Sequence, residues 1–416
     1  MTLFSASLLV LALAADPGVP GPAPRLDGWR VVGPGGGGTM RRPAVSPHDP
    51  KVVVEGCDMT GSYITRDGGA SWRMFNLGWV VNAYAFDPSA PDVIYAAGSA
   101  LWRSDDGGRG WAMVFPDPAR NTVEHGWGDH ADVVYTTDDP LYPSGQSVSV
   151  QTVAVDPADS RRLFLALSST APGPPGSHPT SVTVLLGSDD RGHAWRRLTE
   201  MAAERIFALW VEKEPSPLLR AVGEKAVYEG WGQEWRRFEA PGGQAIESGR
   251  FGRFRDTTLL YVTTALAPNA KAPGGIHVSK DGGRTWRGAN GTLAAGAGEG
   301  GEMWGPAARS RPSLGPIAVS AEQGLTAYVG LRGLRTAPGA PKLNGIAKTA
   351  DGGRSWTIVH AEEDRPSKNL DPSWIETRAL EDGSSVWFDA PYDLAVAPES
   401  PDVCYATDLF RTYRTE

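Results

Sequence analysis

The chain has 416 residues, of which 41% are hydrophobic and 21% charged, a balance that supports a packed core and excludes a disordered chain. Its 51 glycines and 34 prolines are numerous for a helical protein and favour short strands joined by tight turns. The net charge is −8 and the basic residues are scattered, which argues against nucleic acid as a partner.

The N-terminus carries an apolar run from Leu8 to Ala15, followed by a Pro/Gly/Ala stretch to Pro24. The run is too short to span a bilayer, and its small residues are typical of a signal peptide, although no Lys or Arg precedes Arg25. We expect a signal peptide over residues 1–15, a linker over 16–26, and a secreted protein, extracellular or periplasmic. An upstream start codon or a lipid-free membrane tether is the alternative.

Five segments share the pattern Ser/Thr-x-Asp-x-Gly-x-x-Trp, known as the Asp box: residues 65–72, 104–111, 188–195, 279–286 and 349–356. A sixth copy ending at Trp235 keeps the Gly and Trp but lacks the Asp. The Gly supplies the positive φ of a tight β-hairpin, and the Asp and Ser/Thr side chains can bond to the turn. We interpret the boxes as structural hairpins and not as calcium or catalytic sites.

A second repeat, strand, Pro-rich turn, strand, covers residues 44–54, 85–95, 154–165 and 395–405. Together with a box hairpin, each unit supplies about four strands, which predicts a blade of a β-propeller. We expect an all-β propeller of about six to seven four-stranded blades over residues 27–375. Residues 376–416 are either the start of a second propeller, our first expectation, or a closing blade. The chain stops at Glu416, where a further box would begin, so we expect the sequence to be truncated.

Long Gly/Pro-rich insertions separate the units, and long loops in a compact fold are usually functional. They hold aromatic residues such as Trp127 and Trp304, which could stack on sugar rings. Cys57 and Cys404 fit neither a metal spacing nor a disulfide framework, so we interpret them as buried thiols and leave their pairing open. We expect no cofactor and no metal, and a monomer.

Two stretches resemble the xyloglucan-specific endoglucanases of glycoside hydrolase family 74. The first is the Gly-rich run at 35–38 with Cys57-Asp58-Met59-Thr60-Gly61-Ser62-Tyr63, similar to the family's Thr-Asp-x-Gly-Gly-x-Tyr. Cys57 and Thr60 depart from that motif. The second is Tyr392-Asp393-Leu394, similar to a Gly-Asp-Leu motif that opens the family's second propeller, with Tyr392 in place of the Gly.

The resemblance implies a secreted glycoside hydrolase that cleaves a β-glucan or xyloglucan polysaccharide by an inverting mechanism with two carboxylates. Asp58 would be the general base and Asp393 the general acid, with Asp408 as the alternative because it repeats the first-blade pattern. Tyr63, Trp127 and Trp304 would bind substrate.

Asp boxes also occur in proteins of other functions, so two alternatives stay open. One is a non-enzymatic propeller, similar to sortilin or to photosystem assembly factors, that binds a peptide or protein. The other is a sialidase, which needs an Arg triad and a Tyr/Glu pair. For the sialidase, Arg41-Arg42-Pro43 is a distant match to the Arg-Ile-Pro near the start, and no Tyr stands out as the nucleophile.

Overall fold

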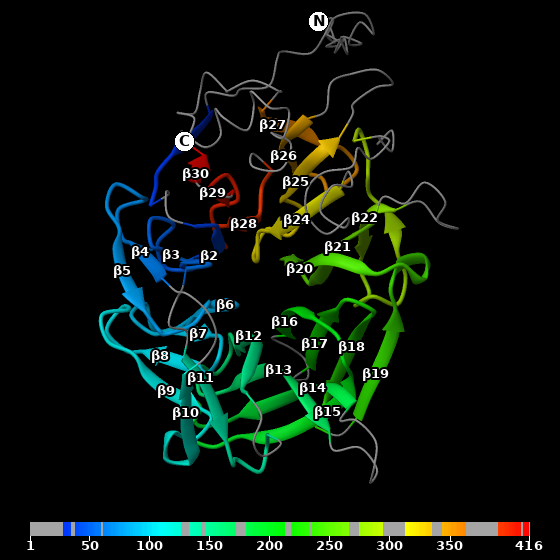
Figure 1. Cartoon of the computed structure of the whole chain (residues 1–416). Helices are drawn as coiled ribbons and strands as arrows, with labels where there is room; N and C mark the ends of the chain where they lie inside the picture. The colour runs from blue at the N-terminus through cyan, green and yellow to red at the C-terminus, as the bar shows by residue number, and fades with distance from the viewer. Residues whose placement is uncertain are drawn as a thin grey trace, which may run out of the picture.

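The computed structural model describes residues 28–34, 38–59, 61–125, 133–142, 147–171, 180–212, 218–232, 234–265, 274–293, 313–334, 343–362, 390–408 and 411–415. These residues form a ring of seven four-stranded antiparallel sheets around a central channel (Figure 1), which confirms the predicted propeller and sets its blade number at seven. The predicted signal peptide and linker, residues 1–26, lie outside the described residues.

Within each blade the strands follow chain order from the channel outward. Blades 1 to 3 contain β2 (Met40–Val45), β3 (Val53–Cys57), β4 (Gly61–Thr65), β5 (Arg73–Asn76); β6 (Ala83–Phe86), β7 (Ile94–Ala97), β8 (Leu101–Ser104), β9 (Ala112–Phe115); and β12 (Ser149–Val155), β13 (Leu163–Ala171), β14 (Thr180–Ser188), β15 (Arg196–Ala202). Blades 4 to 6 contain β16 (Ile206–Glu212), β17 (Leu218–Gly223), β18 (Ala226–Trp231), β19 (Glu234–Glu239); β20 (Ile246–Phe254), β21 (Thr257–Thr264), β22 (Gly275–Ser279), β23 (Arg287–Gly288); and β24 (Ser313–Val319), β25 (Ala327–Leu334), β26 (Leu343–Thr349), β27 (Thr357–Glu362).

The seventh blade joins the two ends of the chain. It contains β28 (Asp393–Val396), β29 (Cys404–Thr407) and β30 (Thr412–Thr415), and its outermost strand is β1 (Trp29–Val31), which pairs antiparallel with β30. Of the two expectations for residues 376–416, the sheet order therefore assigns the described strands to a closing blade. Our first expectation, that these strands begin a second propeller, does not agree with this pairing.

The second strand of each blade is buried on both faces because a neighbouring blade covers each one. All residues of β3, β7 and β29 are buried. Cys57 and Cys404 lie on two of these strands, and both are buried, free thiols. The outer strands β5 and β19 are largely exposed, which explains their charged sequences.

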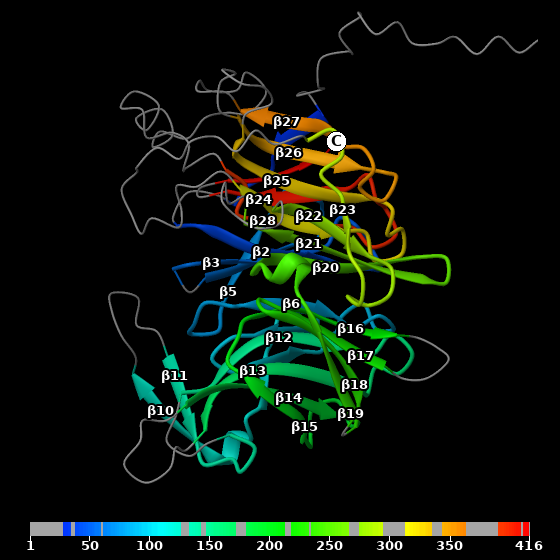
Figure 2. The same cartoon turned by 90° about the vertical axis from the view of Figure 1, so that its right-hand side faces the viewer.

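The antiparallel strand order separates the connections into two groups. The links between blades and those between second and third strands begin and end at one end of the ring, which we call the insertion face. The turns between first and second strands and the Asp boxes between third and fourth strands lie at the opposite end, the box face. A small hairpin, β10 (Asn121–His125) and β11 (Val133–Thr137), follows the short helix η2 (Pro118–Arg120) and stands out beside the ring (Figure 2).

The Asp boxes are structural, as predicted. Each carboxylate accepts hydrogen bonds from its own hairpin; Asp351 Oδ1, for example, accepts from Thr349 Oγ1 at 2.8 Å and from the N–H of Ser355 at 3.0 Å. In four boxes the indole N–H of the Trp donates to a main-chain oxygen of the preceding blade, as Trp356 does to Ala289 at 2.7 Å. The boxes therefore join neighbouring blades at the face opposite the insertions.

Candidate functional site at the insertion end of the channel

The innermost strand of every blade contributes to one cavity of about 1640 Å³ in the centre of the ring. Its wall carries seven charged side chains: Arg42, Arg205, Arg250, Arg332, Glu204, Glu247 and Asp393. Five of them lie at or beside the start of an innermost strand, and Arg332 lies near the end of the second strand of blade 6; both positions face the insertion end because of the antiparallel order. Arg250 lies in the middle of β20.

β-bulges turn extra side chains into this end of the channel. Five of the seven innermost strands, β2, β12, β16, β20 and β24, have a register shift within their first residues. The extra residues all line the cavity; they are Arg42 and Pro43, Gln151, Phe207, Glu247, and Gly315 and Pro316. Bulges are common beside binding sites because they redirect side chains. Because five innermost strands have a β-bulge near the same end of the channel, we take this end as a candidate site.

Asp393 lies at the start of β28 and points into the channel wall. Its Oδ2 accepts from the N–H of Arg42 at 3.1 Å, and its Oδ1 lies 3.4 Å from Arg42 Nη1. It is 8% exposed. The negative charge of Asp393 also acts on Arg205 and Arg250. It raises the pKa of each guanidinium, against the larger lowering caused by burial. Both oxygens of the carboxylate are occupied by donors of Arg42 in the channel wall.

Asp58 follows β3 at the insertion face and is half-buried, outside the lining of the channel. Its Oδ1 accepts from the N–H of Thr39 at 2.8 Å. A Cβ on Gly38 would lie 2.3 Å from that oxygen, which explains why a glycine precedes Thr39. The first-blade motif therefore orients a carboxylate, as the family resemblance implies.

The structure brings Asp58 and Asp393 to one strand. Their N–H donors, Thr39 and Arg42, are three residues apart and so at most about 11 Å from each other. Inverting glycosidases place their two carboxyl groups roughly 6.5–9.5 Å apart. The main-chain donors of the two carboxylates thus lie close together at the start of the first blade, although 335 positions separate Asp58 and Asp393 in the chain.

The other predicted site residues lie elsewhere. Asp408 is 1% exposed and forms an ion pair with Arg411 at 2.6 Å, so it is not accessible to a polymer. Tyr63 lies half-buried on β4, outside the channel lining. Trp127 and Trp304 fall outside the described residues.

The structure adds a cluster of arginines that sequence reasoning missed. Burial and the neighbouring Arg42 lower the pKa of Arg205, and burial lowers that of Arg250 to about 10. Arg205 is exposed in the channel, and Arg250 is half-buried in its wall. Only Arg42 was noticed, within Arg41-Arg42-Pro43; the others lie in separate blades without a shared motif.

Tyr392 and Glu247 complete the lining. The guanidinium carbons of Arg41 and Arg332 each lie 5.7 Å from the ring centroid of Tyr392, a cation–π distance. Enclosure raises the pKa of Glu247, and the charge of Arg332 acts in the opposite direction. The hydroxyl of Tyr392 makes no hydrogen bond to Glu247, so the Tyr/Glu pair of a sialidase is not formed between these two residues.

Within the described part of the chain, no three His, Cys, Asp or Glu residues are grouped so that they could hold a metal ion. No helix there is long and apolar enough to cross a membrane.

Solved propellers resemble this chain in fold. A glycoside hydrolase family 74 xyloglucanase from Xanthomonas campestris matches with a TM-score of 0.57 and 18% identity, over 93% of this chain and 53% of its own length. YCF48 bound to D1 peptide matches with a TM-score of 0.53 and 14% identity, over 95% and 99%. YCF48 from Cyanidioschyzon merolae matches with a TM-score of 0.50 and 12% identity, over 94% and 98%.

The chain thus spans about half the length of the xyloglucanase. At these identities the likeness shows the fold alone. The sequence matches no protein-family model and none of the curated proteins compared with it.

Proposed function

We propose that this chain is a binding propeller without hydrolytic activity, which holds a peptide or protein segment at its insertion face. The observation that carries the proposal is the environment of Asp393. Both of its oxygens are engaged by Arg42, through a main-chain N–H and the guanidinium, so the carboxylate at the position of the general acid already serves as a partner within the channel wall.

Two features support binding at this face. The cavity of about 1640 Å³ opens among the innermost strands, and concave sites of this kind with a few convergent polar groups are typical of ligand binding. The resemblance to YCF48 bound to D1 peptide also extends over nearly the whole of both chains.

A second candidate is the predicted glycoside hydrolase acting on a β-glucan or xyloglucan. It is favoured by the placement of Asp58 and Asp393 on the N–H groups of one strand. In that case Glu247 fits the acid's role better than Asp393, because enclosure raises the pKa of Glu247.

The two candidates are separated by assaying the same protein for both activities. We expect no release of reducing ends from xyloglucan or mixed-linkage β-glucan above the level of an Asp58→Asn/Asp393→Asn double variant. We also expect the immobilised protein to select a shared motif from a random-peptide library. Hydrolysis by the wild-type protein that the double variant or Glu247→Gln abolishes would establish the second candidate instead.

A further inference from the structure

The charges of the channel wall do not balance. Arg42 is paired with Asp393, and Arg332 lies close enough to Glu247 to act on its pKa. The remaining acid, Glu204, is turned toward its own blade, where it accepts from the hydroxyl of Tyr228 and, at 2.8 Å, from the N–H of Lys225. Arg205 and Arg250 are left over, and no described carboxylate forms an ion pair with either.

Both of these guanidinium groups are held against one bulge residue, Phe207. The guanidinium carbon of Arg205 lies 5.1 Å from the Phe207 ring centroid. Arg250 Nη1 donates to the Phe207 carbonyl at 3.0 Å and to that of Gly249 at 2.8 Å. The Nε and Nη2 groups of Arg250 make no hydrogen bond to the described residues. The fold therefore positions two neighbouring cations and leaves donors open between them.

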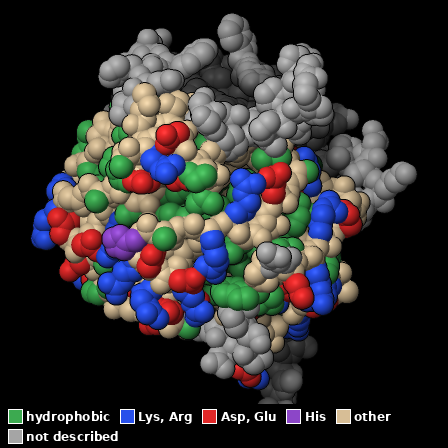
Figure 3. Space-filling view, turned by 90° about the horizontal axis from the view of Figure 1, so that it is seen from below, with side chains coloured by type: hydrophobic (Ala, Val, Ile, Leu, Met, Phe, Trp, Pro, Cys, Tyr) green, Lys and Arg blue, Asp and Glu red, His purple; other side chains and the backbone are tan. Residues whose placement is uncertain are grey.

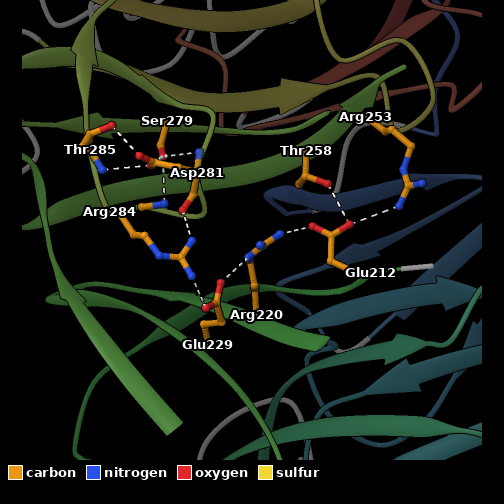
Figure 4. A network of polar contacts seen from close by, with 10 residues as sticks. Glu212, Arg220, Glu229, Arg253, Thr258, Ser279, Asp281, Arg284 and Thr285 are labelled. Atoms are coloured by element: carbon orange, nitrogen blue, oxygen red, sulfur yellow. Dashed lines mark hydrogen bonds and ion pairs between the residues drawn. The ribbon is translucent and has the colours of Figure 1, made fainter. Parts of the chain in front are cut away.

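The arginines between blades 4 and 5 differ, because they form ion pairs with acids. Arg220, Arg253 and Arg284 form ion pairs with two glutamates inside the ring wall (Figure 4). On the face seen in Figure 3, basic and acidic side chains are interspersed. At Arg205 and Arg250, by contrast, burial and the charges of neighbouring arginines lower the pKa of both guanidinium groups. A bound anion would offset this mutual repulsion.

We propose that Arg205 and Arg250 bind a carboxylate of the ligand at the Phe207 bulge. A guanidinium presents its donors in a planar fork that matches a carboxylate, which favours this anion over a compact halide. The inference rests on the proposed function, so the carboxylate belongs to a peptide. Its source is either an acidic side chain or a free C-terminus, which share this chemistry.

The first test uses a small carboxylate and does not require a peptide. We expect sodium glutarate to raise the melting temperature of the wild-type protein above its value in sodium chloride of equal ionic strength. Arg205→Gln should abolish the difference, because it removes the cation and its contact with the Phe207 ring while breaking no ion pair of the described structure. Arg236→Gln, the same charge change on the exposed outer strand β19, should retain it. An equal shift in wild type and Arg205→Gln would overturn the proposal.

The second test uses a peptide taken from the library selection, synthesised in four forms. The first form keeps the side-chain carboxylates and the C-terminal carboxylate. The second lacks only the C-terminal carboxylate, through amidation, and the third lacks only the side-chain carboxylates, because Asn and Gln replace Asp and Glu. The fourth form lacks both kinds. The form that loses the essential carboxylate should bind about tenfold to a hundredfold more weakly, and Arg205→Gln should weaken the intact form by the same factor. Arg250→Lys, which keeps the charge without the fork, should give a smaller loss.

The outcomes separate this inference from the proposed function. Binding of all four forms with equal affinity would refute the carboxylate site and leave peptide binding intact. If glutarate raises the melting temperature in an Arg205-dependent way but no peptide is selected, peptide binding is refuted and the carboxylate site is supported. Glucuronate in place of glutarate would then test whether the site binds an acidic sugar.

Discussion

Glu55 is a buried carboxyl at the seam between the first and the closing blade. It lies on β3 with no exposed surface, and its Oε1 accepts from Thr412 Oγ1 of β30 at 2.7 Å. Its Oε2 has no hydrogen-bond partner within the described structure. Burial raises the pKa of Glu55 to about 8, against the smaller opposite effect of the Thr412 hydroxyl. The folded protein therefore keeps a proton here that the unfolded chain releases.

The sign of the pH effect follows from this difference. Because the folded pKa exceeds the ordinary value of 4.5, the free energy of unfolding is unaffected below pH 4.5 and falls between there and about pH 8. The slope from this group approaches about 1.4 kcal/mol per pH unit. We expect Glu55→Gln, which is neutral at every pH, to be more stable than wild type at pH 8 and similar at pH 4.5. Urea unfolding of both proteins across this range measures the difference. An unchanged difference across the range would show that Glu55 does not stay protonated in the fold.

At the scale of elements, blades 4 and 5 are joined by a network of alternating charges (Figure 4). Arg220 on β17 donates to Glu212 and, at 3.1 Å, to Glu229. Both glutamates have further partners: Arg253 and Thr258 of blade 5 contact Glu212, and Arg284 of the blade 5 box contacts Glu229. Because the acids are almost buried, the central arginine neutralises charges that water cannot solvate.

We expect Arg220→Met to destabilise the protein by about 3 kcal/mol, since breaking a buried pair leaves uncompensated charges. The triple variant Arg220→Met/Glu212→Gln/Glu229→Gln should recover most of the loss. Arg197→Met, which breaks an exposed pair with Glu200 on β15, serves as the control and should cost less than about 1 kcal/mol. Denaturation midpoints compare the variants; equal losses at the two arginines would contradict the argument.

Elements with a repeating signature could be predicted from the sequence. The boxes and Pro-rich turns recur with fixed spacing, and the strand pairs predicted at 44–54, 85–95, 154–165 and 395–405 are the first two strands of blades 1, 2, 3 and 7. The bulges could not be predicted, because one extra residue in a strand has no signature in composition. For the same reason the arginine cluster stayed hidden, since the bulge at Phe207 helps to bring Arg205 and Arg250 together.

At the scale of the whole molecule, the surroundings of Asp393 could not be predicted from the sequence either. Local sequence indicated a carboxylate at the start of an inner strand, and the structure places it there. Its partner Arg42 is 351 positions away in the chain and contacts it only because the ring closes. The contacts that hold the Asp393 carboxylate are thus a property of the closed ring.

Closure depends on the short strand β1, and Trp29 is its anchor. This residue is 3% exposed and lies between two blades. Its ring centroid is 5.7 Å from that of Tyr413 in blade 7, 6.5 Å from that of Tyr328 and 5.9 Å from that of His360, both in blade 6. A three-residue strand has few main-chain hydrogen bonds, so most of its attachment comes from this side chain.

We expect Trp29→Ala to lower the free energy of unfolding by about 3–5 kcal/mol, the range for removing a large aromatic side chain from a core. Trp29→Phe should lose less, because the phenyl ring keeps part of the aromatic contact. Urea denaturation followed by circular dichroism gives the free energies, and proteolysis near Trp29 reports detachment of β1. Because Trp29 packs blade 7, which carries Asp393, against blade 6, Trp29→Ala should also weaken binding at the channel, whereas an equally destabilising substitution such as Arg220→Met should leave it unchanged. A Trp29→Ala protein as stable as wild type would mean that the ring stays closed without this anchor.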